Sequence, residues 1–124
     1  MTTLELSPLN KTWIIDLDGT VVKHNGYKID GKDTFLENAK DFLNNIPESD
    51  MVIFITSRTE NERYSTEKFL HEHNIKYDHI IYNAPFGERI LINDAKPSGL
   101  CTAYAVCTKR DDPINISFCI NDEM

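Results

Sequence analysis

The chain has 124 residues, about the length of one domain. Its composition, 40% hydrophobic and 27% charged, is typical of ordinary globular proteins and excludes a disordered or fibrous one. Thirteen lysines and arginines against twenty aspartates and glutamates give a net charge of −7. The basic residues are scattered and form no stripe, which argues against nucleic acid as a partner. A catalytic domain with a separate substrate domain would not fit this length, so we expect residues 1–124 to form a single domain.

The N-terminal residues 1–8 lack the charged segment followed by an apolar one that marks a signal peptide. The apolar runs are about five residues long at most, far short of a membrane span. We therefore expect a cytoplasmic protein with no membrane partner.

The first half of the chain alternates between strand and helix patterns. The apolar run 13–17 predicts a buried strand, and an Asn-Gly pair within 21–29 predicts a hairpin. Apolar residues at helical spacing predict a helix over 34–46, opened by a capping box of Thr34 and Glu37.

The second half continues this alternation. The run 51–55 predicts a second buried strand, and a capping box of Thr59 and Glu62 opens a helix to about residue 73. Further strands are predicted over 79–82, 89–93, 102–107 and 114–120. The whole pattern predicts a three-layer, doubly wound α/β fold, Rossmann-like, with a mainly parallel sheet and helices on both faces.

Polar side chains follow three of the predicted strands. Asp16 and Asp18 end the first strand, Thr56 follows the second, and Asp94 follows the run 89–93. The carboxyl ends of parallel strands converge on one crevice, so we expect these four residues to meet there.

Three carboxylates at one point need a counter-charge. At about 4 Å each pair repels by about 4 kcal/mol at an effective dielectric of 20. A bound cation or shifted pKa values would relieve this repulsion. Because the set contains only oxygen ligands, Asp16, Asp18 and Asp94 favour Mg²⁺, and a Mg²⁺ site of few carboxylates points to phosphoryl transfer.

These residues resemble the motifs of the haloacid dehalogenase superfamily of phosphatases. Asp16-Leu17-Asp18-Gly19-Thr20 is similar to the first motif, Thr56 to the second, and Asn93-Asp94 to the acidic last one. The resemblance covers roughly residues 12–107. Asp-x-Asp-Gly-Thr after a buried strand is specific for this family. The other two motifs are weak alone and support the resemblance through their order and context.

The resemblance implies a catalytic role for each acid. Asp16 would attack phosphorus and form an aspartyl-phosphate, and Asp18 would protonate the leaving oxygen and later deprotonate water. Thr56 would donate its hydroxyl to the phosphate. Mg²⁺ would bind the carboxylates of Asp16 and Asp94 and the backbone carbonyl of Asp18.

The chain departs from the family at one point, because no lysine follows the strand over 79–82. We expect Lys96 to replace it, since it lies two residues past Asp94, whereas Lys76 and Arg89 should lie at the opposite end of the sheet. The residues expected to bind substrate are Gly19, Thr20, Ser57 and Arg58. Arg58 could instead be a solvated residue beside the helix start, and Ser57 also fits a turn.

The segments between the motifs are too short for a cap domain, so we expect a capless enzyme with an open site. The implied substrate is either a phosphorylated macromolecule or a small metabolite covered by a neighbouring subunit, which would require a homo-oligomer. We favour a small phosphorylated sugar, as in surface polysaccharide metabolism. The alternative, motivated by the absent lysine, is a catalytically weak relative that binds a phosphorylated ligand or a partner protein.

Overall fold

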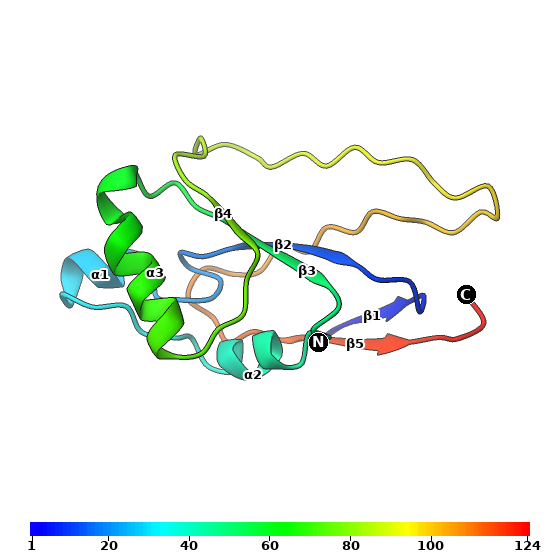
Figure 1. Ribbon diagram of the computed structural model, residues 1–124, viewed down its shortest axis with the longest axis horizontal. Coiled ribbons are helices and arrows are strands. Elements are labelled where there is room, and N and C mark those ends of the chain that lie inside the picture. The colour runs from blue at the N-terminus through cyan, green and yellow to red at the C-terminus, as the bar shows by residue number, and fades with distance from the viewer.

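A computed structural model describes all of residues 1–124. Its central sheet has three parallel strands in the order β2 (Thr12–Asp16), β3 (Met51–Ile55) and β4 (His79–Ile81). β1 (Thr2–Leu6) and β5 (Ile116–Ile120) form a separate parallel pair (Figure 1). The strands predicted over 13–17, 51–55, 79–82 and 114–120 are confirmed; the second has the predicted boundaries, and the others differ by one or two residues.

The helices are α1 (Gly26–Ile29), α2 (Ala39–Asn44) and α3 (Arg63–Glu72), and the 3-10 turn η1 (Glu60–Glu62) precedes α3. The predicted capping box is present, since the Thr59 backbone N–H donates to the Glu62 carboxylate at 3.0 Å. Asn74, in the left-handed conformation at φ 55°, follows the end of α3. None of these helices combines the length and apolarity that crossing a membrane would require.

Two predicted elements between β2 and β3 differ in the structure. The hairpin expected within 21–29 is replaced by α1, which starts after Asn25 in the left-handed conformation. The helix expected over 34–46 is reduced to α2, because Phe35 forms an antiparallel bridge with Val22. The capping box expected at residue 34 therefore has no helix to open.

The sheet is covered on one face only. Side chains alternate between the two faces of a strand. On one face Ile15 and Phe54 pack with Leu43 of α2 and Leu70 of α3 in the hydrophobic core. On the other face Ile14 remains about half exposed. The fold is therefore a mixed α/β structure with parallel strands and few helices, and the three-layer arrangement expected from the sequence is not formed.

Residues 84–113, which we call the arm, connect β4 to β5 without any helix or strand. The arm runs out to one end of the molecule and returns (yellow to orange in Figure 1). The strands predicted over 89–93 and 102–107 are wrong, because neither segment pairs with β2 or β4, the two edge strands of the sheet. Ile90 and Ile92 are consequently 82% and 90% exposed.

Candidate active site

The carboxyl ends of β2, β3 and β4 are joined by backbone hydrogen bonds that continue past the strands. The Leu17 N–H donates to the Ile55 carbonyl at 3.3 Å, and the Thr56 N–H donates to the Ile81 carbonyl at 2.9 Å. The Ala84 N–H donates to the Thr56 carbonyl at 3.0 Å. The residues that follow the strands are thus held at one edge of the sheet.

A tight turn after β2 directs Asp18 back toward β3. Gly19 has φ 84°, a conformation that favours glycine, and its N–H donates to the Val22 carbonyl at 2.7 Å. A Cβ atom at this position would lie 3.1 Å from Cγ of Arg110, on the returning part of the arm. Glycine is favoured here by the backbone conformation, and a larger residue would also require the Arg110 side chain to shift slightly.

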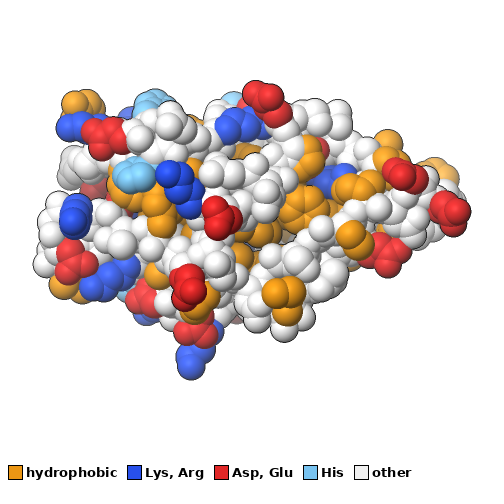
Figure 2. Space-filling model, turned by 90° about the horizontal axis from the view of Figure 1, so that it is seen from below, with side chains coloured by type: hydrophobic (Ala, Val, Ile, Leu, Met, Phe, Trp, Pro, Cys, Tyr) orange, Lys and Arg blue, Asp and Glu red, His pale blue; other side chains and the backbone are white.

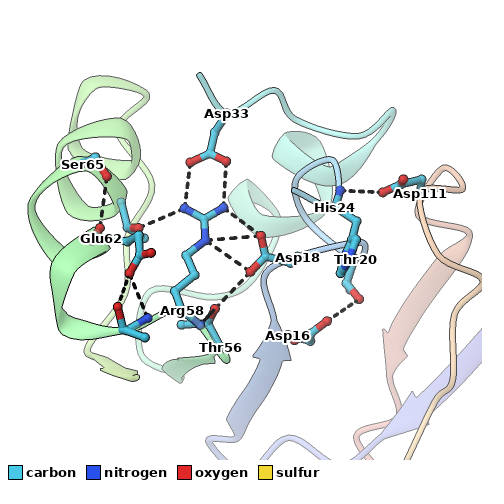
Figure 3. A network of polar contacts seen from close by, with 12 residues as sticks. Asp16, Asp18, Thr20, His24, Asp33, Thr56, Arg58, Glu62, Ser65 and Asp111 are labelled. Carbon is cyan, nitrogen blue, oxygen red and sulfur yellow. Dashed lines mark hydrogen bonds and ion pairs between the residues drawn. The ribbon is translucent and has the colours of Figure 1, made fainter. Parts of the chain in front are cut away.

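Asp18 lies at the centre of a hydrogen-bond network (Figure 3). The Thr56 hydroxyl donates to Oδ2 of Asp18 at 3.0 Å, and it accepts from the Arg58 backbone N–H at 3.0 Å. The guanidinium of Arg58 donates to Asp18 through Nη2 at 2.8 Å and through Nε at 3.2 Å. The one hydroxyl proton of Thr56 is therefore committed to Asp18 in this arrangement, and Thr56 positions that carboxylate.

Arg58 is itself held from several sides. Asp33 accepts from Nη1 at 2.9 Å and from Nη2 at 2.7 Å, and Thr66 of α3 accepts from Nη1 at 2.9 Å. The ring of Tyr27 lies 4.1 Å from the guanidinium carbon. Burial acts to lower the pKa of Arg58, but hydrogen bonds to Asp33 and Asp18 outweigh it and raise the pKa above its ordinary value.

Asp16 lies at the same edge and is more accessible than Asp18. The Thr20 hydroxyl donates to Oδ2 of Asp16 at 3.2 Å, and Nη1 of Arg89 donates to Oδ1 at 3.1 Å. Arg89 was expected at the opposite end of the sheet. It reaches Asp16 because residues 89–93 are not a strand of the sheet, and the arm instead passes over its carboxyl edge.

The positions of Asp94 and Lys96 differ most from those expected from the sequence. Five residues of extended chain beyond Arg89 span up to about 16 Å, and the arm runs there toward the far end of the molecule (Figure 1). The Asp94 carbonyl accepts from the Thr102 hydroxyl, and the Lys96 N–H donates to the Leu100 carbonyl at 3.0 Å. Neither residue joins Asp16 and Asp18, because the strand expected to carry them there is not formed.

The residues present do not fit a Mg²⁺ ion as they are arranged. No group of three aspartate, glutamate, histidine or cysteine side chains is placed to hold a metal. The Asp18 carboxylate faces Arg58 and Thr56, and Asp16 faces Arg89 and Thr20. The carboxylates that were expected to share a cation are compensated by arginines instead.

Sequence reasoning missed two acids of this region. Asp33 lies in a loop without a motif, and no sequence signal indicated it. Asp111 is an exposed turn residue whose carboxylate accepts from the His24 backbone N–H at 2.7 Å and whose own N–H donates to the Gly19 carbonyl at 2.9 Å. Ser57 is half-buried between Thr56 and Arg58.

Two solved chains are similar to this one. A chain in the structure of the Pnkp1/Rnl/Hen1 complex is 27% identical, with a TM-score of 0.52 over 67% of this chain and 31% of that chain. A chain in the structure of the Pnkp1/Rnl/Hen1 RNA repair complex is 28% identical, with a TM-score of 0.52 over 65% of this chain and 28% of that chain. The protein thus spans less than a third of either chain and is structurally similar to part of an RNA repair complex. No protein-family model and no curated protein matches it.

Proposed function

We propose that the protein is a phosphatase of the haloacid dehalogenase type that hydrolyses a phosphate monoester through an aspartyl-phosphate. The observation that carries this proposal is the meeting of Asp16, Asp18 and Thr56 at the carboxyl edge of the sheet, directly after a buried strand. The same edge leaves Asp16 accessible to a substrate, while Asp18 is fixed beside it.

In the proposed reaction an oxygen of Asp16 attacks phosphorus, and the bond from phosphorus to the leaving oxygen breaks. Asp18 first takes up a proton from solvent and then passes it to the leaving oxygen as this bond breaks. Asp18 then accepts a proton from the water that attacks the aspartyl-phosphate, which releases inorganic phosphate and restores Asp16. Arg89 adjoins Asp16 and offsets negative charge there.

The proposed substrate is a phosphorylated RNA end. The support is the similarity to part of an RNA repair complex, which favours this substrate over the small sugar phosphate suggested by the sequence. A polymer end also suits an accessible edge. The net charge of −7 argues for recognition of the terminal phosphate and against broad electrostatic binding of the RNA backbone.

A second candidate is a phosphate-binding protein without turnover. The observation that favours it is the position of Asp94 and Lys96 on the arm, away from Asp16. An RNA chain with a terminal phosphate would then bind at the edge without being hydrolysed.

Phosphate release from four substrates separates these proposals: an aryl phosphate, a hexose phosphate, and RNA oligonucleotides phosphorylated at the 3′ or the 5′ end. We expect release from an RNA end, and we expect Asp16→Asn to abolish it. Asp30→Asn is the matched control, because Asp30 pairs with Lys23 outside the network. Dependence on Mg²⁺ stays a prediction of the sequence, and assays with added Mg²⁺ or with a chelator test it. No release from any substrate under either condition would refute the phosphatase.

A further inference from the structure

We infer that Arg58 and Asp33 are positioning residues that fix the carboxylate of Asp18, and that Arg58 does not bind the substrate phosphate. The inference rests on the proposed function in one respect, since it takes Asp18 as the residue that handles the proton. It also corrects the expectation that Arg58 contacts substrate.

The first argument is a count of hydrogen-bond donors. A guanidinium has five N–H groups and no acceptor. In Arg58 the Nε–H donates to Asp18. The two Nη1–H groups donate to Asp33 and Thr66, and the two Nη2–H groups donate to Asp18 and Asp33. Every donor is used within the protein, so none is left for a phosphate oxygen.

The second argument is burial. The side chain of Arg58 is 2% exposed and that of Asp33 is 6% exposed. The Tyr27 ring lies against the guanidinium, and Thr66 borders it from α3. A phosphate could reach Arg58 only by displacing one of the two carboxylates, which would leave a buried charge without its partner.

The third argument is the direction in which the network acts. Asp33, in the loop between α1 and α2, makes a two-point contact with one side of the guanidinium, and Asp18 takes the other side (Figure 3). Such fork-like pairs fix orientation as well as distance. Asp33 thus orients Arg58, and Arg58 orients Asp18, without Asp33 contacting the reacting atoms.

Kinetics of Asp33→Asn in the full chain test the inference. We expect kcat to fall about 10- to 100-fold with KM unchanged, because a positioning group acts on the reaction and not on substrate binding. Asp33→Glu, which keeps the charge, should restore part of kcat, and the control Asp30→Asn should keep both constants. Arg58→Met and the double variant Arg58→Met/Asp33→Asn should have equal kcat, since Asp33 has no effect without Arg58. Unchanged kcat in Asp33→Asn, or a raised KM alone, would overturn the inference.

A measurement independent of activity separates this inference from the proposed function. In ¹⁵N-labelled protein the Nη–H signal of Arg58, from the groups that donate to Asp33, should exchange slowly with solvent, as a clamped guanidinium requires. Asp33→Asn should remove this protection and Asp30→Asn should keep it. Persistence of the protected signal in Asp33→Asn would show that Asp33 does not hold Arg58. If the wild-type protein hydrolyses nothing, the phosphatase fails and this signal alone decides whether the clamp exists. This exchange measurement needs only the variant Asp33→Asn, so it can be made even if Arg58→Met does not fold.

Discussion

At the scale of single residues, the candidate site combines side chains that stand at strand ends with two arginines, Arg58 and Arg89, that pair with them. Of the four residues expected to meet there, Asp18 and Thr56 are in hydrogen-bond contact and Asp16 ends the neighbouring strand β2, whereas Asp94 lies elsewhere. Arg58 was recognised as a candidate, but its role depends on Asp33, which comes from a loop whose path no local pattern indicates. The pairing of Arg89 with Asp16 was also missed, because it depends on the path of the arm, which the sequence did not predict.

Arg89 and Lys96, the two cations considered as partners of the proposed nucleophile Asp16, give a comparison. We expect Arg89→Ala to lower kcat/KM about tenfold, equivalent to about 1.4 kcal/mol, because Arg89 contacts Asp16. Lys96→Ala should have a smaller effect, and Lys40→Ala, on the exposed surface of α2, serves as the control. Steady-state kinetics on the best substrate measure these differences. A larger loss in Lys96→Ala would restore the expectation drawn from the sequence.

At the scale of elements, local signals were reliable where they needed no distant partner. The apolar run of β3 and the capping box before α3 both form where predicted. The predicted helix over 34–46 failed, because the bridge between Val22 and Phe35 fixes its first residues in another conformation. Such a bridge joins two segments, and the periodicity of one segment carries no information about it.

The capping box has a measurable contribution to stability. We expect Glu62→Ala to lower the free energy of unfolding by about 0.5–1 kcal/mol at pH 7, because two contacts with Thr59 are lost. The hydrogen bond from Thr59 lowers the pKa of Glu62 below its ordinary value. A lowered pKa in the folded state stabilises the protein above the unfolded-state pKa of about 4.3, and this stabilisation is lost as the pH falls through the folded-state value.

Urea unfolding at pH 7 and near pH 3 measures this difference. The two proteins should converge at the lower pH. Glu48→Ala is the control, since the Glu48 side chain is exposed and makes no hydrogen bond or ion pair in the structure. A difference that persists undiminished at pH 3 would contradict the assignment.

At the scale of the whole molecule, the sequence predicted a sheet with two helical layers, and the structure has one covered face. Apolar runs such as 89–93 have the composition of strands, yet strand formation also needs a neighbouring edge. The free edge of β2 is not used by the arm, so Ile90 and Ile92 remain at the surface. Figure 2, which views the molecule from below, shows further hydrophobic side chains at the surface. Composition predicts how well a segment would suit a sheet, but not whether the chain path brings it to one.

The arm should be the least protected part of the molecule. Hydrogen exchange measured by mass spectrometry should show amides of residues 86–106 exchanging fastest and those of β3 slowest, because few backbone hydrogen bonds hold the arm. Trypsin should cut first after Arg89, whereas the bond after Lys96 is protected by Pro97. Protection of the arm equal to that of β3 would mean that it pairs with another strand in solution.

The charges around Asp16 and Asp18 do not cancel. Three carboxylates, those of Asp16, Asp18 and Asp33, surround two guanidiniums, those of Arg58 and Arg89, which leaves one negative charge. An incoming phosphate dianion therefore meets repulsion from these carboxylates, and of the two arginines that pair with them only Arg89, on the arm, can turn toward it. Dissolved salt weakens that repulsion, so this site should admit its substrate more readily at high ionic strength than at low.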